Sequence, residues 1–259
     1  MTGTQFTGKV VVVTGGGSGQ GRAAVRQFAA EGAKVVVADW NEDAAAAVTK
    51  EVVADGGTAT PARADVSSEE DVRAMIEVAT SEYGRLDVLF NNAGVGFSAR
   101  NRFTMASVVD TPVQDWDSIL AINLKGAALG CKYAIPIMMR QGGGAIVNNA
   151  SVNGIAAVLG ADAYTAAKGG IVALTRVLAV EWGAKGVRVN CICPGGIETP
   201  MIAEALQDEE YAKGLRDENP MKRLGRPEEI ASVAVFLASD AASYVNGVIL
   251  PVDGGWTAA

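Results

Sequence analysis

The sequence predicts an α/β fold in which one domain, spanning residues 1–259, holds a doubly wound parallel sheet with helices on both faces. Short β-branched runs alternate with longer stretches of helical periodicity from the N-terminus onward, which is typical of successive strand–helix–strand units. The runs Val10–Val13 and Val35–Val37 show no polar alternation, as expected for strands that are covered on both faces. No linker-like stretch and no internal repeat interrupts this alternation, so a single domain is predicted.

The elements follow from these patterns in chain order. Seven strands are predicted, at Lys9–Thr14, Lys34–Ala38, Ala59–Ala62, Leu86–Phe90, Ala145–Asn149, Val187–Ile192 and Gly247–Val252. Helical periodicity separates them at Gln20–Glu31 and Glu42–Ala54 and near Glu69, Asp115, Ala163 and Glu228. The least regular segments, residues 95–111 and 195–224, each follow a strand end, where open α/β sheets bind their ligands. We expect these two segments to be substrate loops.

Composition restricts the partners and the compartment. Of the 259 residues, 49% are hydrophobic and 20% are charged, which is typical of a globular protein. The formal net charge is -7 and no basic stripe accompanies it, which argues against nucleic acid and anionic membranes as partners. The polar opening Met1–Lys9 lacks the pattern of a signal peptide, and no apolar run is expected to reach the length of a bilayer span. A cytoplasmic protein is therefore predicted.

The chain contains no histidine, which excludes Ser-His-Asp and Cys-His catalysis, His-Glu-x-x-His zinc sites and any imidazole base. The three cysteines, Cys131, Cys191 and Cys193, form no paired disulfide framework and lack the partners of a zinc site. We predict free, buried or half-buried thiols in a reducing compartment, and no metal site.

A glycine-rich turn, Thr14–Gly21 (TGGGSGQG), joins the first predicted strand to the first predicted helix. Glycine lets the chain turn tightly there, and it lets backbone N–H groups and the helix N-terminus approach a diphosphate. An ordinary glycine-rich turn is the alternative. The strand before it and the helix after it favour a dinucleotide-binding turn of the Rossmann type.

An acid follows the second predicted strand. Asp39 lies eighteen positions beyond Gly21, where a carboxylate bonds the adenosine ribose hydroxyls. In NADP a phosphate of about -1.5 to -2 charge would face this carboxylate, and no Arg or Lys in Gly16–Gly19 offsets the repulsion. NAD is therefore the predicted cofactor, with a solvated strand-end carboxylate as the alternative interpretation of Asp39.

Further motifs follow in a fixed order. They are Asp65-Val66, Asn91-Asn92-Ala93-Gly94, Asn123, Ser151, Tyr164-x-x-x-Lys168 and Pro194-Gly195. Together with the glycine turn, they make the sequence similar to the short-chain dehydrogenase/reductase family over essentially the whole chain. The resemblance implies that Asp65 and Val66 hold the adenine and that the Asn91–Gly94 turn lines the cofactor groove. It also implies that Thr199 binds the nicotinamide carboxamide and that Ile197 approaches it through its backbone. The cofactor-binding residues predicted in these ways are Gly15, Ser18, Gly19, Gln20, Gly21, Asp39, Asp65, Val66, Asn92, Ala93, Gly94, Tyr164, Lys168, Pro194, Gly195, Ile197 and Thr199.

The chain departs from the family pattern at two places. Gln20 stands where the family usually has an aliphatic residue, and its amide either reaches a phosphate or points to solvent. The stretch between Gly94 and Asn123 is several residues longer than is usual in the family. A relative's substrate therefore does not transfer directly to this chain.

Four residues are the candidate catalytic set. Tyr164 and Lys168 lie four residues apart in a predicted helix, so their side chains share one face. A free tyrosine has a pKa of about 10, and we expect the nearby ammonium to lower the pKa of Tyr164. Ser151 follows a predicted strand end and is expected to hold the substrate oxygen. The resemblance implies that Asn123 holds a water that relays protons to Lys168, completing an Asn-Ser-Tyr-Lys tetrad. Singly, these residues are typical of packing, surface charge or capping, whereas together they favour catalysis.

The predicted function is hydride transfer between NAD(H) and a compact, mostly apolar secondary alcohol or ketone, with Tyr164 as general acid and base. The expected pocket segments carry the apolar side chains of Val95, Phe97, Phe103, Met105, Val152, Ile155, Leu159, Met201, Ile202 and Leu206. Arg100 and Arg102 offer an anion site instead, although arginines in irregular segments are more often solvated, and Asn153 offers one polar contact. The alternatives are a non-catalytic NAD sensor and a 3-oxoacyl carrier-protein reductase, the latter disfavoured by Asp39 and by the acidic chain.

A homotetramer is also expected, as in most of the resembling family. The stretch Ala163–Trp182 is small or apolar over most of its circumference. One face of a sheet cannot cover such a helix, so part of it should meet another subunit.

Overall fold

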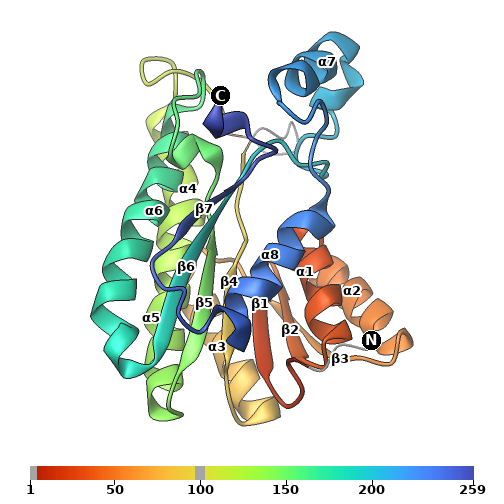
Figure 1. Ribbon diagram of the computed structural model, residues 1–259, viewed down its shortest axis with the longest axis vertical. Coiled ribbons are helices and arrows are strands. Elements are labelled where there is room, and N and C mark those ends of the chain that lie inside the picture. The colour runs from red at the N-terminus through yellow and green to blue at the C-terminus, as the bar shows by residue number, and fades with distance from the viewer. Residues whose placement is uncertain (1–4, 97–102) are drawn as a thin grey trace.

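Seven parallel strands form the centre of the computed structural model, which describes residues 5–96 and 103–259 (Figure 1). They are β1 (Val10–Thr14), β2 (Lys34–Asp39), β3 (Thr58–Arg63), β4 (Val88–Asn91), β5 (Gly144–Asn149), β6 (Val187–Pro194) and β7 (Ile249–Val252). Their order is β3-β2-β1-β4-β5-β6-β7, and every neighbouring pair is parallel. The predicted doubly wound sheet is confirmed, and its switch point lies between β1 and β4.

Helices cover both faces of this sheet. They are α1 (Gly19–Ala30), α2 (Glu42–Ala54), α3 (Glu69–Tyr83), α4 (Val113–Leu120), α5 (Gly126–Arg140), α6 (Asp162–Trp182), α7 (Glu209–Glu218) and α8 (Pro227–Ala238), with a π-helix, η1 (Ala121–Lys125), between α4 and α5. Short 3₁₀ turns lie at η2 (Val152–Gly154), η3 (Gly183–Lys185), η4 (Ala205–Gln207), η5 (Asp240–Ala242) and η6 (Trp256–Ala258).

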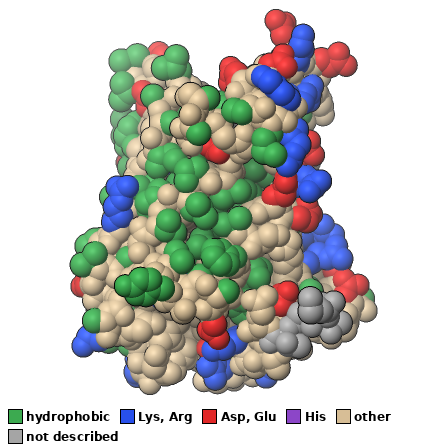
Figure 2. All heavy atoms as spheres, viewed as in Figure 1, with side chains coloured by type: hydrophobic (Ala, Val, Ile, Leu, Met, Phe, Trp, Pro, Cys, Tyr) green, Lys and Arg blue, Asp and Glu red, His purple; other side chains and the backbone are tan. Residues whose placement is uncertain are grey.

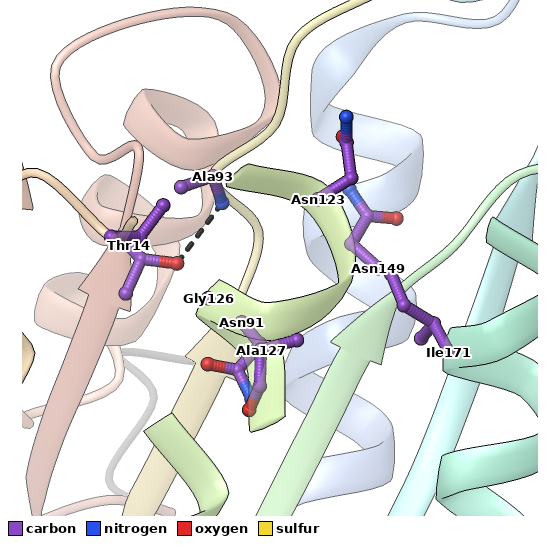
Figure 3. A pocket seen from close by; sticks show the side chains of 9 residues that line it. Thr14, Asn91, Ala93, Asn123, Gly126, Ala127, Asn149 and Ile171 are labelled. Atoms are coloured by element: carbon purple, nitrogen blue, oxygen red, sulfur yellow. Dashed lines mark hydrogen bonds between the residues drawn. The ribbon is translucent and has the colours of Figure 1, made fainter. Parts of the chain in front are cut away.

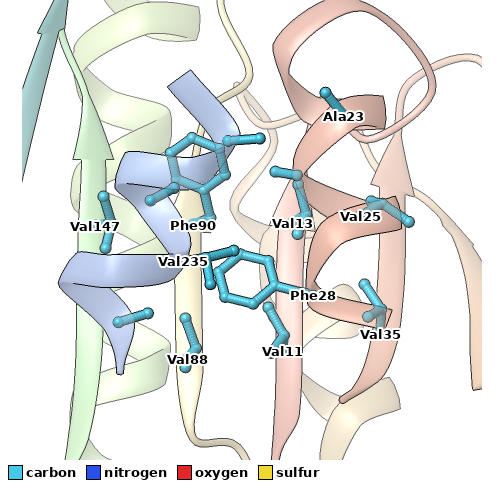
Figure 4. Packing of buried hydrophobic residues seen from close by; sticks show 14 of the residues in the cluster. Val11, Val13, Ala23, Val25, Phe28, Val35, Val88, Phe90, Val147 and Val235 are labelled. Carbon is cyan, nitrogen blue, oxygen red and sulfur yellow. The ribbon is translucent and has the colours of Figure 1, made fainter. Parts of the chain in front are cut away.

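Alternate residues of each central strand face opposite helical layers. Val13 packs with Phe28 of α1 and Val235 of α8 (Figure 4). Its neighbour Val12 packs on the other side with Met138 of α5. Phe28 is completely buried, and burial of a side chain of this size stabilises the fold by about 1.5–3 kcal/mol. The strands are therefore unbroken apolar runs because neither of their faces meets water.

Two regions differ in detail from the sequence prediction. The segment 195–224 contains a helix, α7, which lies above the carboxyl ends of the strands (Figure 1). Asp208 caps it by accepting from the N–H groups of Glu210 at 3.0 Å and Tyr211 at 3.1 Å. The helix predicted near Asp115 is three pieces, because the π-helix η1 separates α4 from α5. Such π-turns often mark functional sites.

The segment Asp162–Lys185, which contains α6, is long and apolar enough to cross a membrane by length and composition alone, with a hydropathy of 1.2. This differs from the expectation that no apolar run reaches bilayer length. Ile171 and Val172 of this helix pack with the β6 residue Cys191 in a buried cluster. The core helix of a folded domain passes the same compositional test, and 39% of this apolar segment is buried inside the structure.

Candidate active site

The glycine turn after β1 has a shape that side chains would prevent. Gly15 and Gly19 have φ values of +64° and +49°, in the left-handed region. A Cβ on Gly21 would lie 2.0 Å from the main-chain oxygen of Gly15, so only glycine fits there. The turn brings Ser18 to the N-cap of α1, where its side chain makes no capping bond. The first N–H groups of α1 therefore remain available to an anion.

Asp39 reaches this turn from the end of β2. It is 7% exposed, and its carboxylate accepts hydrogen bonds from the N–H of Gly17 at 2.9 Å and of Asn41 at 3.0 Å. A Cβ on Gly17 would lie 2.9 Å from the nearer carboxylate oxygen. Asp39 belongs to none of the ion pairs in the described part of the chain. A fixed, uncompensated carboxylate beside a diphosphate turn fits the adenosine half of a dinucleotide.

The ends of β1 and β4 are tied together at the switch point. The Thr14 hydroxyl accepts from the N–H of Asn92 at 2.9 Å. It also accepts from the N–H of Ala93 at 3.0 Å (Figure 3). The Asn92 amide donates to the main-chain oxygen of Thr14 at 2.9 Å. Asn92, which the family resemblance places in the turn that lines the cofactor groove, thus holds the glycine turn against β4 with its side-chain amide. A pocket here is lined by Thr14, Val66, Asn91, Ala93, Asn123, Gly126, Ala127, Asn149 and Ile171 (Figure 3).

Asn123 lies in the π-helix η1 and is 1% exposed. Its amide accepts from the N–H of Val95 at 3.2 Å and donates to the Val95 oxygen at 3.1 Å. A Cβ on Gly94 would lie 2.6 Å from the Asn123 Oδ1 and 3.5 Å from the Lys168 Nζ. Asn123 therefore fixes the chain that leaves β4 and lies close to the ammonium of Lys168.

Ser151, Tyr164 and Lys168 meet beyond the end of β5. The side-chain hydroxyls of Ser151 and Tyr164 are hydrogen-bonded. The Lys168 Nζ lies 5.5 Å from the centre of the Tyr164 ring and donates to the main-chain oxygen of Asn149 at 2.8 Å. The Ser151 Oγ also lies 3.2 Å from the Oδ1 of Asn153 and accepts from the N–H of Asn153 at 3.2 Å. The structure thus brings the predicted catalytic residues together.

The electrostatics of this cluster differ from the sequence expectation. Burial raises the pKa of Tyr164 to about 12, although the hydrogen bond from Ser151 acts to lower it. This contradicts the expectation that the neighbouring lysine lowers the pKa of Tyr164 below its ordinary value. Burial also lowers the pKa of Lys168 to about 8, since its ammonium is removed from water.

The remaining predicted cofactor residues surround the same edge of the sheet. The Oδ1 of Asp65 accepts from the N–H and the hydroxyl of Ser67, at 2.9 and 2.7 Å. Val66 is buried against Gly126, and Pro194 ends β6, followed by Gly195. Ile197 is buried, and the side chain of Thr199 lies 3.3 Å from the position of a Cβ on Gly19. The loop after β6 therefore reaches back to the glycine turn.

Apolar side chains gather around Tyr164. Val95, Phe103 and Met105 pack in one cluster with Tyr164. A Cβ on Gly96 would lie 3.0 Å from the Met201 sulfur and 3.4 Å from the Tyr164 ring, so both predicted substrate loops approach Tyr164. Leu159, by contrast, is 94% exposed. Phe97, Arg100 and Arg102 lie outside the described residues.

Sequence reasoning missed two side chains that contact this site. Asn149 joins β5 to Gln20 of α1 through a hydrogen bond of 2.7 Å, and Trp116 packs in the cluster around Tyr164. The polar Asn149 at the end of an apolar strand is a signal that could have been noticed. Trp116 follows from no local pattern. The described residues contain no group of three or more Cys, Asp and Glu side chains that could hold a metal, and the three cysteines are free and buried.

A doubly wound sheet with a glycine turn at its switch point and a Ser-Tyr-Lys cluster beyond β5 defines a nicotinamide-dependent oxidoreductase. The chain belongs to the short-chain dehydrogenase/reductase family, and its residues 15–257 match a family model described as enoyl-(acyl carrier protein) reductase.

The chain is similar to proteins of this family over nearly its whole length. It is 43% identical to levodione reductase of Leifsonia aquatica over 267 residues, covering 99% of this chain and 97% of that protein. It is 39% identical to cyclohexanol dehydrogenase of Acinetobacter sp. (strain SE19) over 253 residues, covering 98% and 96% of the two chains. A crystal structure of levodione reductase matches with a TM-score of 0.92 at 41% identity, covering 98% of this chain and 99% of that one.

Proposed function

We propose that the chain interconverts a secondary alcohol and a ketone with NAD(H), and that Tyr164 transfers the proton. The observation that carries this proposal is the contact between the Tyr164 and Ser151 hydroxyls beside the buried Lys168 ammonium. A substrate oxygen that meets both hydroxyls is polarised by Ser151 and exchanges a proton with Tyr164. Bound NAD supplies the hydride acceptor, and its reduced form the hydride donor.

Tyr164 and Lys168, both buried and titratable, have different roles in the proposed reaction. Because burial raises the pKa of Tyr164 to about 12, its phenol is protonated near neutrality and ready to protonate a carbonyl oxygen. The reverse direction needs the phenolate, and the Lys168 ammonium, 5.5 Å from the centre of the ring, is placed to stabilise it. Burial lowers the pKa of Lys168 to about 8, so this ammonium is charged below that pH. We therefore expect ketone reduction to be the faster direction near neutrality.

The preference for NAD over NADP rests on Asp39. Its carboxylate is held 2.9 Å from the N–H of Gly17, at the place where the adenosine ribose belongs. Ribose hydroxyls donate to such a carboxylate, whereas a 2'-phosphate of about -1.5 to -2 charge is repelled by it. The absence of an ion pair to Asp39 among the described residues leaves that repulsion uncompensated.

The substrate is a compact and mostly apolar secondary alcohol or ketone. Val95, Phe103, Met105 and Met201 approach Tyr164 with apolar or thioether surface. The relative named for cyclohexanol takes a compact cyclic secondary alcohol, which such a lining would admit. Asn153, hydrogen-bonded to Ser151, adds a further polar side chain beside the expected substrate oxygen.

A carrier-protein-linked acyl substrate is the second candidate, because the matching family model is described as an enoyl-(acyl carrier protein) reductase. An acidic carrier needs a basic docking surface. On the face shown in Figure 2, the lysine and arginine side chains are interspersed with acidic ones rather than gathered into a patch. The net charge of -7 also disfavours this partner.

We also propose a cytoplasmic homotetramer that uses the outer face of α6. Ala166, Ala173, Val177 and Val180 form an exposed stripe of small and apolar residues, with Val180 85% exposed. A second subunit of the same kind would cover this stripe. Three free, buried thiols fit a reducing compartment.

A turnover panel tests the proposed function. Cyclohexanol-like and aryl-alkyl alcohols, hydroxy acids and a β-ketoacyl thioester are compared by the change in NADH absorbance, each with NAD(H) and NADP(H). We expect the neutral alcohols with NAD to give the highest kcat/KM. A hydroxy acid or the thioester that turns over about tenfold faster, equivalent to about 1.4 kcal/mol, would contradict the apolar pocket. Tight NADH binding without turnover of any compound would favour a sensor.

A further inference from the structure

Three side-chain amides link the two sides of the switch point. The Asn149 Nδ2, at the end of β5, donates to the Oε1 of Gln20 at 2.7 Å and to the Oδ1 of Asn92 at 2.9 Å. The Asn92 Nδ2 donates in turn to the main-chain oxygen of Thr14 at 2.9 Å. The ends of β1, β4 and β5 and the first turn of α1 are thus joined by one chain of hydrogen bonds beneath the expected path of the dinucleotide.

Asn149 has one polar atom without a partner. Both hydrogens of its Nδ2 are used, yet its Oδ1 is buried and accepts no hydrogen bond from the described residues. The residue is 7% exposed, so bulk water does not reach this oxygen freely. An unpaired buried acceptor costs about 1–3 kcal/mol, and such a cost commonly marks a ligand contact.

The same bond fixes the direction of the Gln20 amide. Because the Oε1 of Gln20 faces Asn149, its Nε2 points the other way, and this donor makes no hydrogen bond within the described residues. Gln20 is the second residue of α1, where the N–H groups favour an anion. The main-chain oxygen of Asn149, at the other end of the pair, holds the ammonium of Lys168. The pair therefore lies between the glycine turn and the catalytic cluster.

We propose that Gln20 and Asn149 form a paired-amide contact for the ribosyl diphosphate part of the dinucleotide, an inference that rests on the proposed NAD site. Gln20 donates to a diphosphate oxygen, and the Oδ1 of Asn149 accepts from a hydroxyl of the adjoining ribose. Diphosphate oxygens only accept near neutral pH whereas ribose hydroxyls also donate, so the free donor and the free acceptor match their neighbours along the ligand.

In an amide pair with a purely structural role, both the nitrogen donor and the oxygen acceptor of each amide would be hydrogen-bonded within the protein. Gln27, on the same helix, is hydrogen-bonded in this way: its Nε2 donates to the main-chain oxygen of Glu228 at 3.1 Å and its Oε1 accepts from the Ser232 hydroxyl at 3.3 Å. This amide joins α1 to α8 through both its nitrogen and its oxygen. It is the matched control for Gln20, since both are glutamines of α1 that bridge to another element.

A series of ligands of increasing length tests the proposal without measuring turnover. Dissociation constants of AMP, ADP-ribose and NADH are measured by calorimetry for wild type, Gln20→Met, Asn149→Leu and Gln27→Met. We expect Gln20→Met and Asn149→Leu each to weaken ADP-ribose and NADH by about tenfold and AMP by less than about twofold. Gln27→Met should bind all three ligands as wild type does.

The other outcomes contradict the proposal in distinct ways. Unchanged affinities, or an equal loss for AMP, would show that Gln20 and Asn149 only join two elements of the fold and do not contact the ribosyl diphosphate. A loss for NADH but not for ADP-ribose would place the contact at the nicotinamide ring instead. If Asn149→Leu does not fold, Gln20→Met decides, because its side chain is only half-buried. A wild-type chain that binds none of these ligands would refute the proposed NAD site itself.

Discussion

The Nζ of Lys168 and the main-chain oxygen of Asn149 are 2.8 Å apart, so Lys168 of α6 is anchored to the end of β5. Lys168 is 4% exposed, and burial lowers its pKa from 10.5 to about 8. Burial therefore favours the neutral amine of Lys168 over its ammonium, and keeping the ammonium charged reduces the stability of the folded chain. A stability cost of this kind is expected where geometry serves catalysis.

Removing this charge should stabilise the fold in a pH-dependent manner. Below about pH 8 the folded chain keeps Lys168 protonated against burial, so the cost is fully present there. As the pH rises from 8 to 10.5, the folded chain loses this proton while the unfolded chain keeps it, and the cost disappears. We expect Lys168→Met to have a higher Tm than wild type near pH 7, with the gain shrinking toward pH 10.5. The exposed Lys50→Met is the control, and a pH-independent difference for Lys168→Met would contradict the assignment.

Tyr164→Phe should abolish turnover without loosening the cofactor site. Only the hydroxyl bonded to Ser151 is lost, while the ring still packs in its apolar cluster. General acid–base groups contribute about 10²–10⁴-fold, and kcat should fall by that range. The dissociation constant of NADH should stay within about threefold of wild type. A variant that keeps most of its kcat would show that another group transfers the proton.

Asp39→Asn should shift the cofactor preference toward NADP. The two N–H groups bond different carboxylate oxygens, Gly17 to Oδ2 and Asn41 to Oδ1, so the single amide oxygen of asparagine can keep one of these bonds. The charge that repels a 2'-phosphate is removed. We expect the ratio of kcat/KM for NADP to that for NAD to rise by about tenfold or more. Equal use of both cofactors by wild type would refute the role of Asp39.

Two glycine substitutions should have contrasting effects, one on NADH affinity and the other on the stability of the fold. In Gly21→Ala the new Cβ would lie 2.0 Å from the Gly15 oxygen, so the turn must shift and NADH affinity should fall by about tenfold or more. Gly214→Ala, in the exposed middle of α7, meets nothing within 4 Å. It should raise the free energy of unfolding by about 0.5–1 kcal/mol and leave NADH affinity unchanged. Urea unfolding and NADH titration of both variants check this contrast.

Val180→Glu should dissociate the proposed tetramer. A charge on the exposed outer stripe of α6 would be buried unpaired in an interface between subunits. Light scattering at micromolar concentration should show a smaller particle for Val180→Glu than for wild type. Val53→Glu places the same charge on an exposed valine of α2, and it should not change the particle mass. A monomeric wild type would refute the tetramer.

The sheet was predictable because its signal is local. Strands such as β1 and β2 are covered on both faces, so each appears in the sequence as an uninterrupted valine run. The glycine turn and the spacing of Tyr164 and Lys168 are likewise short-range patterns, and the structure brings them together.

The parts that sequence reasoning missed depend on tertiary contacts or lie in a short, largely charged segment. The bond between Gln20 and Asn149 joins residues 129 positions apart. The pKa of Tyr164 rises because the folded chain removes it from water, which no local pattern reports. Helix α7 has only ten residues, EEYAKGLRDE, and its largely charged composition resembles that of a surface loop.

The cysteines of α5 and β6 have a practical consequence for measuring the dynamics of the molecule. All three are buried, and burial raises the pKa of the Cys131 thiol to about 12. A thiol-reactive dye added to the folded protein therefore meets no accessible thiolate until the interior opens. The labelling rate of these three thiols in the unmodified chain then reports how often the interior of the folded protein opens to solvent.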